Sequence, residues 1–519
     1  MCIRDSVRFV GAPPASVGKF GGETDNWMWP RHTCDFSMFR VYADQDGEPA
    51  AYSKDNVPYR PKNTLKVSLK GFDDGDFAMI MGYPGRTQRF QTAAQLKQML
   101  ATNDISIAAR TVRQDIMWDA RMADPVVNLQ YANKYASSSN GWKKWIGMRE
   151  SFANLGILER EEQKEAEFAA WAAAKKKRQA EYGDAIEKIA AGVEASSEAE
   201  KAYTLLVESI YRIELVGFSS RFMSGYKRGL REGMDSTEAL AFAKNVVREQ
   251  YKDYSVDLDK KEAVALIDFY LENVRENDMI DVADLGADSV ESYVEALFAD
   301  SKFDTEEELE SIASYDEAFA DPALGLYNSI ARAAQKMMPE MEAYADQIAE
   351  GSKAFAKGLM EWKADEPSYP DANSTMRLTY GSVKSYSPKD GVLYKHYTTL
   401  KGVMEKEDPD NYEFRVPEKL KAVYEAKDFG PYVNAAGEVP ACFLINCDIT
   451  GGNSGSPVMD ADGNLIGLAF DGNWESMSSD VMFEPDLQRC ICVDIRYVML
   501  LLDKVGGAGY LLDEMDIVR

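Results

Sequence analysis

The pattern of apolar and polar positions divides the chain into three stretches. Up to about residue 90, and again from about residue 375, short segments alternate with a period of two and are rich in aromatic and β-branched residues. This alternation is typical of half-buried β-strands. We predict strands over residues 35–42, 64–69, 77–85, 376–380, 391–394, 442–445 and 464–470.

Between about residues 91 and 370 the apolar positions recur with helical spacing, and proline becomes scarce. We predict helices over residues 157–182, 202–222, 236–251, 260–276, 305–319 and 326–349, and a last one over 496–504. The basic run 175–178 is interpreted as a solvated helix face and not as a binding patch. The predicted organisation is a β segment (1–90), an inserted helical domain (91–370), and a β segment with a C-terminal helix (371–519).

Length and composition exclude several classes of protein. The 519 residues are enough for about two to four domains, and no apolar run approaches the length of ~20 residues that a membrane span needs. A net charge of -27 argues against a nucleic-acid partner. The six cysteines form no C-x-x-C pair, and there are only two histidines, so we expect neither a metal nor a cofactor.

A glycine-rich turn, residues 451–457, carries the strongest candidate chemistry. Ser454 lies between glycines, after one predicted strand and before another. Glycines beside a serine allow backbone N–H groups to point at one place next to its hydroxyl. An oxyanion hole for acyl transfer needs this arrangement. The same composition also fits a plain turn between two strands, so the local pattern leaves both interpretations open.

A serine nucleophile needs a base, normally histidine, and an acid that orients the base. His32 lies three residues before Asp35, and on one extended segment this odd spacing places the two side chains on opposite faces. His396 lies among aromatic residues, a setting more typical of a packed or surface histidine than of a base. Neither histidine is therefore a good candidate for the base.

Asp35 opens a hydrophobic strand in the way the triad acid does in chymotrypsin-like double barrels, where the chain order is His, Asp, Ser. A histidine for Ser454 is therefore expected upstream of Asp35. Residues 1–6 have neither the basic start nor the apolar core of a signal peptide, and the chain then continues as if inside a domain. We expect that an N-terminal portion of the protein precedes this sequence.

Three long motifs resemble the bacterial dipeptidyl-peptidase 7 and 11 family: residues 20–37, 448–457 and 466–475. They lie far apart and follow the family's order, and the resemblance covers nearly everything after residue 6. It implies a mixed β and α fold, in which a chymotrypsin-like double β-barrel carries a large inserted all-α domain. The first barrel would be incomplete here.

The resemblance also implies roles for individual residues. Ser454 resembles the nucleophile and Asp35 the triad acid, and the backbone N–H groups of Gly452 and Ser454 would form the oxyanion hole. The free α-amino group of a peptide would be held by the Asn26 side chain, the Trp27 carbonyl group and the Asn140 side chain. A protonated amine needs several fixed acceptors. Anchoring it at a set distance from the nucleophile would measure off two residues.

Gly472 is the informative specificity position in the resemblance. The branch of the family that cleaves after Asp or Glu has an arginine there, which pairs with the acidic side chain of the substrate. Gly472 supplies no charge and is expected to leave room, which favours an apolar or aromatic residue before the scissile bond. Cys34 is a departure from the family, which usually has glycine at this place.

The sequence therefore predicts a serine dipeptidyl-peptidase that acts on peptides with a free N-terminus, although these 519 residues lack the base and would be nearly inactive alone. Two alternatives stay open: an Asp/Glu-specific dipeptidyl-peptidase, and a non-catalytic protein-binding module that uses the acidic helical domain. The resemblance further implies export to the periplasm or cell surface, and a homodimer.

Overall fold

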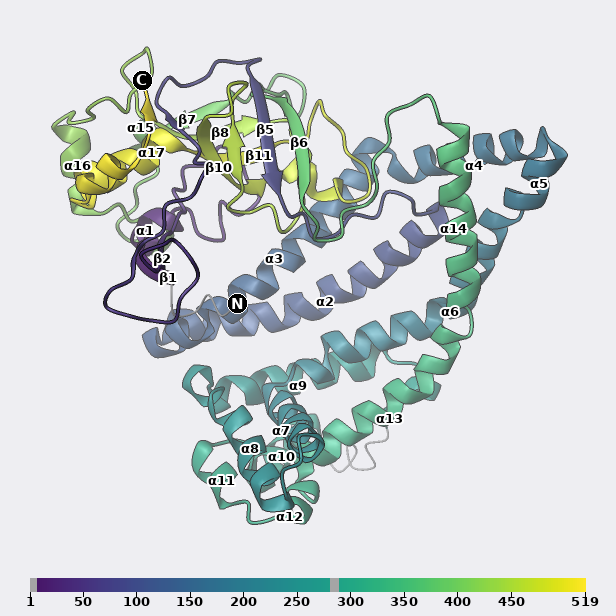
Figure 1. The fold of residues 1–519 in the computed structure, drawn as a ribbon. Coiled ribbons are helices and arrows are strands. Elements are labelled where there is room, and N and C mark those ends of the chain that lie inside the picture. The colour runs from purple at the N-terminus through teal and green to yellow at the C-terminus, as the bar shows by residue number, and fades with distance from the viewer. Residues whose placement is uncertain (1–6, 281–288) are drawn as a thin grey trace. The chain divides into compact units, whose positions relative to one another are not determined.

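The computed structural model describes residues 7–280 and 289–519, which form two units (Figure 1). Residues up to Arg89 and from Tyr369 onward form a unit that we call the β unit, and Phe90–Ser368 form the helical unit. The chain thus leaves the β unit once and returns to it once, so two connections join the helical unit to the rest of the chain.

Two sheets form the framework of the β unit. The smaller has the order β1 (Val7–Gly11), β2 (Met38–Ala43), β3 (Val57–Pro58). The larger follows the path β6 (Arg377–Ser382), β5 (Phe77–Gly82), β9 (Pro457–Met459), β10 (Leu465–Gly472), β11 (Cys490–Asp494), β8 (Pro440–Ile445), β7 (Tyr397–Thr399). Neighbours on this path pair antiparallel, whereas β4 (Val67–Ser68) pairs parallel with β10 and with β12 (Ile517–Val518).

The strands of the described residues do not close into the two barrels that we expected. The larger sheet runs as an open path, but a single antiparallel bridge, Val383 with Ile445, joins the chain just after β6 to β8. Two backbone hydrogen bonds support this bridge, at 3.1 and 3.0 Å. The strands β5, β8, β9, β10 and β11 all contribute apolar side chains to one buried cluster.

Three predicted elements of the β unit differ from the observed ones in their bounds, because strands and helices are defined by the backbone hydrogen bonds that are formed. The strand predicted to open at Asp35 begins at Met38, so the aspartate lies in the irregular segment before it. Residues 391–394 form no strand, and Tyr394 makes only an isolated bridge with Tyr386. The predicted C-terminal helix begins as α17 (Ile495–Leu500) and continues as a π-helical turn, Leu501–Val505.

The helices of the helical unit range from 31 residues in the two longest to five in the shortest. They are α2 (Ala93–Ala123), α3 (Pro125–Leu155), α4 (Ile157–Ala173), α5 (Lys176–Tyr182), α6 (Ala185–Glu208), α7 (Glu214–Arg231), α8 (Ser236–Arg248), α9 (Val256–Asn273), α10 (Val290–Asp300), α11 (Glu306–Ser311), α12 (Tyr315–Phe319), α13 (Pro322–Glu342) and α14 (Ala345–Trp362). Their largest buried cluster includes Leu206, Phe218, Phe222 and Ile267.

Several predicted helices are wrong in their ends. The helix predicted over 202–222 is two helices, because α6 ends at Glu208 and α7 begins at Glu214. The start of α7 is capped from a distant segment, since the buried Asp259 carboxylate accepts from the backbone nitrogens of Glu214 and Leu215 at 2.8 Å each. A cap supplied by tertiary contact leaves no local signal at the helix start. The helices predicted over 157–182, 305–319 and 326–349 are likewise each broken in two.

Candidate active site

The turn that carries Ser454 depends on glycine at two positions. Gly452 has φ +104° and Gly455 has φ +83°, a region that residues with a Cβ atom rarely adopt. A Cβ atom at position 452 would also lie 2.4 Å from the carbonyl oxygen of Tyr83, at the end of β5. Backbone from a distant segment therefore packs directly against the turn, and only glycine fits there.

The hydrogen bonds of the turn do not use two of its backbone amides. The backbone nitrogen of Asn453 donates to the carbonyl oxygen of Thr450 at 3.1 Å, and the Asn453 side chain accepts from the nitrogen of Thr450 at 3.2 Å. In contrast, the backbone nitrogens of Gly452 and Ser454 donate to no acceptor within residues 7–280 and 289–519. A rigid turn with two unengaged amides beside a hydroxyl group has the layout that binds an oxyanion.

Ser454 itself is exposed, and its hydroxyl group donates to the carbonyl oxygen of Phe470 at 3.1 Å. Phe470 belongs to β10, the strand that follows the turn. Among the described residues, no histidine or carboxylate is hydrogen-bonded to this hydroxyl group. The structure therefore presents the serine without a base bound to it.

Asp35 is exposed, and the described residues include no hydrogen bond between it and either histidine or Ser454. Although the residue is accessible to solvent, the protein atoms around its carboxyl group raise the pKa by desolvation, and the positive charge of Arg31 opposes that change. Cys34 beside it is fully buried among apolar side chains. The five described cysteines are all free and buried.

Among the described residues, neither histidine is hydrogen-bonded to Ser454. His32 is buried, and the lack of solvent lowers its pKa to about 3, so the ring is neutral over the working range of most proteins. The Nδ1 atom of His396 lies 3.3 Å from the Ser385 hydroxyl oxygen and 3.6 Å from a carboxylate oxygen of Asp74. Because both neighbours meet the same ring nitrogen, His396 does not form a relay of the Ser-His-Asp kind.

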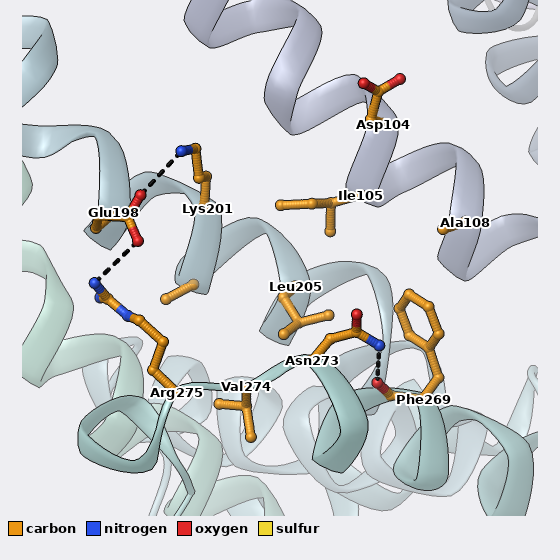
Figure 2. A pocket seen from close by; sticks show the side chains of 11 residues that line it. Asp104, Ile105, Ala108, Glu198, Lys201, Leu205, Phe269, Asn273, Val274 and Arg275 are labelled. Atoms are coloured by element: carbon orange, nitrogen blue, oxygen red, sulfur yellow. Dashed lines mark hydrogen bonds and ion pairs between the residues drawn. The ribbon is translucent and has the colours of Figure 1, made fainter.

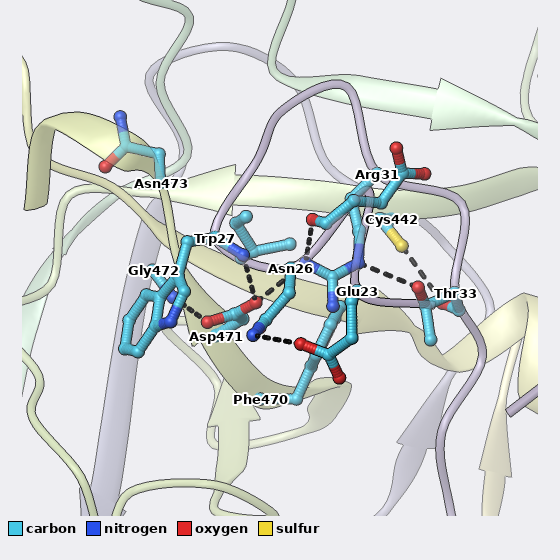
Figure 3. Close-up of polar contacts among 12 residues, drawn as sticks. Glu23, Asn26, Trp27, Arg31, Thr33, Cys442, Phe470, Asp471, Gly472 and Asn473 are labelled. Atoms are coloured by element: carbon cyan, nitrogen blue, oxygen red, sulfur yellow. Dashed lines mark hydrogen bonds and ion pairs between the residues drawn. The ribbon is translucent and has the colours of Figure 1, made fainter. Parts of the chain in front are cut away.

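The segment expected to bind an amine is fixed by charged side chains (Figure 3). The Asn26 side-chain nitrogen donates to Glu23 at 3.3 Å, and the backbone nitrogen of Trp27 donates to Asp471 at 3.1 Å. Trp27 has φ +64°, which is unusual for a residue other than glycine. Arg31 forms an ion pair with the same Asp471 carboxylate at 2.7 Å, and both side chains are buried.

The space next to Gly472 is not open, which corrects our expectation. A Cβ atom added there would lie 2.2 Å from the hydroxyl oxygen of Ser476 and 3.4 Å from the indole ring of Trp27. The Ser476 hydroxyl group donates to the carbonyl oxygen of Asn473 at 2.7 Å. A rotatable hydroxyl group therefore occupies the place where a side chain at position 472 would begin.

Sequence reasoning missed Arg31, Asp471 and Glu23 as parts of this region. Arg31 and Asp471 carry opposite charges and lie in two different motifs of the resemblance, and that pairing was a usable signal. Asn140 lies on α3 in the helical unit and is exposed. The structure places it in a different unit from Asn26 and Trp27.

A cavity of about 350 Å³ lies within the helical unit (Figure 2). Ile105, Leu205 and Phe269 contribute apolar surface to it, while Glu198 at its edge pairs with both Lys201 and Arg275. Its lining contains no serine, cysteine or histidine. It therefore offers none of the side chains that a serine or cysteine peptidase uses as nucleophile and base.

Comparisons with known proteins agree over almost the whole chain. The family model of Peptidase S46 matches residues 2–517. A "Dipeptidyl-peptidase 7" of Phocaeicola vulgatus is 45% identical, and the match covers 99% of this chain and 72% of that protein. An "Asp/Glu-specific dipeptidyl-peptidase" of Porphyromonas gingivalis is 44% identical with the same coverage. The crystal structure of Porphyromonas endodontalis DPP11 with the dipeptide Arg-Glu superposes with a TM-score of 0.89 at 39% identity, covering 99% of this chain and 75% of that one.

Proposed function

The chain belongs to the peptidase S46 family, and we propose that it is a serine dipeptidyl-peptidase, which releases dipeptides from free peptide N-termini. The named relatives act as dipeptidyl-peptidases, and the similarity extends over nearly all of this chain. The observation that supports the serine mechanism is the Ser454 turn, in which an exposed hydroxyl group lies beside the unengaged amides of Gly452 and Ser454.

In the proposed reaction the Ser454 hydroxyl oxygen attacks the carbonyl carbon of the second substrate residue. A base takes the hydroxyl proton, and the resulting oxyanion accepts hydrogen bonds from the amides of Gly452 and Ser454. The proton then passes to the leaving amine, the peptide bond breaks, and the dipeptide stays bound as an ester. Water, activated by the same base, hydrolyses that ester and regenerates the serine.

Neither His32 nor His396 is proposed as the base, because each is packed against other groups. We assign the role of the base to a histidine outside the 519 residues, and we propose that Asp35 orients this histidine. The relatives are longer, since the chain covers 72% of each of the two proteins named above. The 519-residue chain alone is then expected to be nearly inactive.

The amine of the substrate would bind the Asn26 side-chain oxygen and the Trp27 carbonyl oxygen. The contact between the Asn26 nitrogen and Glu23 supports this assignment, because it fixes the orientation of the Asn26 amide group. The anchoring of the Trp27 nitrogen on Asp471 fixes the peptide plane on its N-terminal side. The role of Asn140, like the homodimer and the export of the protein, stays a prediction from the resemblance.

For specificity, we propose a preference for an apolar or aromatic residue before the scissile bond. Gly472 contributes no positive charge, and its neighbours Ser476 and Trp27 are also uncharged. The acid-specific alternative has relatives of nearly equal identity, 44% against 45%, so overall similarity does not distinguish the two. The uncharged Ser476 and Trp27, together with the neutralisation of the nearby Arg31 by Asp471, support the uncharged preference.

The decisive experiment identifies products by mass spectrometry. The 519-residue chain and a version extended from its own gene to the length of its relatives are each incubated with peptides that have free or acetylated N-termini. The proposal predicts dipeptides from the extended protein and free N-termini only, and none from its Ser454→Ala variant. Cleavage of acetylated peptides, or binding of peptides without cleavage by the extended protein, would contradict it, and the latter would favour a binding module.

A further inference from the structure

Three consecutive residues at the end of β10 contact three different parts of the proposed site. The carbonyl oxygen of Phe470 accepts from the Ser454 hydroxyl group at 3.1 Å. The carboxylate of Asp471 accepts from the backbone nitrogen of Trp27 at 3.1 Å. Gly472 lies against Ser476 and the Trp27 indole ring. Residues 470–472 thus contact the proposed nucleophile, the proposed amine-binding segment and the side chains that surround the specificity position, Gly472.

A β-bulge at Phe470 creates this arrangement. In the pairing of β10 with β11, Ala469 lies opposite Cys492 and Asp471 lies opposite Ile491, so Phe470 is the extra residue. A bulge reverses the alternation of side chains and turns the next residue to a new direction. Bulges occur often beside active sites for this reason. Here the residue that follows the bulge is Asp471.

The carboxylate of Asp471 is held rigidly. One of its oxygens accepts from Arg31 Nη1 at 2.7 Å as well as from Trp27, and the other accepts from the nitrogen of Gly472 at 2.9 Å. Arg31 is itself fixed, because it also donates to the carbonyl oxygen of Asp25 and to the hydroxyl oxygen of Thr33, each at 2.8 Å (Figure 3). The side chains of Arg31 and Asp471 are only 9% and 8% exposed, so the pair is shielded from water and held in one geometry.

We propose that Asp471 is the positioning residue that sets the two-residue length of the product. This inference rests on the proposed function, in which Trp27 binds the amine and Ser454 attacks. The path between these two groups runs from Trp27 through the Asp471 carboxylate and one strand residue to Ser454. Apart from the backbone of Trp27 itself, the steps on this path are hydrogen bonds and covalent bonds, so the length of the Asp471 side chain contributes to the distance between amine and nucleophile.

Two substitutions in the extended protein test this inference. Asp471→Glu keeps the charge for Arg31 but lengthens the side chain by one methylene, which displaces Trp27 from Ser454 by about 1.5 Å. A misplacement of this order reduces rate by ~10²-fold. We expect kcat/KM for dipeptide release to fall by about that factor. The matched control is Asp460→Glu, because Asp460 supports the β9–β10 turn and is remote from these contacts.

The melting temperature separates positioning from a merely structural role, because a loss of kcat/KM in a protein of unchanged stability is not an effect of unfolding. If the Asp471→Glu protein melts within a few degrees of the unmodified one and releases dipeptides with unchanged kcat/KM, the inference is wrong. If the unmodified extended protein releases no dipeptides, the proposed function itself fails. These two results are therefore distinguishable.

A binding measurement on the 519-residue chain covers the case in which Asp471→Glu does not fold. The double variant Arg31→Gln/Asp471→Asn removes both charges and leaves no buried ion unpaired. Calorimetry with alanyl-phenylalanine and with its N-acetyl form measures how strongly the free amine is preferred. We expect at least a tenfold loss of that preference in the double variant. An unchanged preference would overturn the inference.

Discussion

The guanidinium group of Arg89 binds both carboxylate oxygens of Asp448, six residues before Ser454. It also donates to the carbonyl oxygen of Ser479 at 2.9 Å and stacks on the ring of Tyr369. Arg89 and Tyr369 are the residues at which the chain leaves and re-enters the β unit. Both connections to the helical unit are thus tied to the segment that leads into the Ser454 turn.

Replacing Arg89 by lysine is expected to lower kcat for dipeptide release by about 10- to 100-fold while KM changes little. Lysine keeps the charge but cannot bind both carboxylate oxygens and Ser479 together, so the Asp448 segment and the following turn lose their fixed position. Steady-state kinetics of the extended protein measure this effect. Arg86→Lys, at an exposed position three residues earlier, is the control and should not change kcat. A change in KM alone would contradict the prediction.

Alanine at position 452 is expected to reduce catalysis by about 10²–10³-fold, the usual effect of losing one oxyanion donor. The new methyl group would meet the Tyr83 carbonyl oxygen at 2.4 Å in a backbone region that favours glycine, so the turn must move. Gly463→Ala is a matched control, since Gly463 also has a positive φ of +77° but has open space around it. It should cost about 1 kcal/mol in unfolding free energy, with activity retained. Equal loss of activity in both variants would refute the assignment.

A switch to acid specificity is expected to need two substitutions, one at Gly472 and one at its neighbour Ser476. Gly472→Arg alone meets the Ser476 hydroxyl oxygen at 2.2 Å from its Cβ atom, whereas Gly472→Arg/Ser476→Ala provides both charge and space. The double variant should raise the ratio of kcat/KM for Xaa-Asp over Xaa-Leu substrates by more than the single variant does. Gly472→Gln/Ser476→Ala, which is long but neutral, controls for size and should leave the ratio low. A switch of equal size in that control would contradict a role of charge.

The burial of His32 predicts a loss of stability in acid. Its folded pKa is about 3 and its ordinary value is 6.5, so below pH 6.5 the unfolded chain takes up a proton that the folded protein does not. Stability is therefore fully present above pH 6.5 and falls by about 1.4 kcal/mol per pH unit as pH drops toward 3. Urea unfolding at pH 7 and 4.5 should show about 3 kcal/mol more loss in the unmodified chain than in His32→Gln. Equal losses would place His32 in a solvated environment.

Structural features that depend only on residues close together in the sequence were predicted correctly. The strand predicted over 442–445 lies in β8 and the one predicted over 464–470 overlaps β10, and the glycine-rich stretch between them forms the tight turn that its composition indicated. The period of apolar positions also predicted that the middle of the chain is helical. These properties follow from side-chain alternation and from the backbone freedom of glycine, which are local.

By itself, then, the sequence determined the order of β and helical segments, the turn at Ser454 and the family to which the chain belongs. Only the tertiary structure decided which groups meet. The Trp27 nitrogen and the Asp471 carboxylate lie 444 positions apart along the chain, and the cap of α7 comes from Asp259, 44 or more positions away. The room at Gly472 was likewise decided by Ser476 and Trp27, after the strand had folded. Contacts of this kind depend on packing between distant segments, and no local period or composition encodes them.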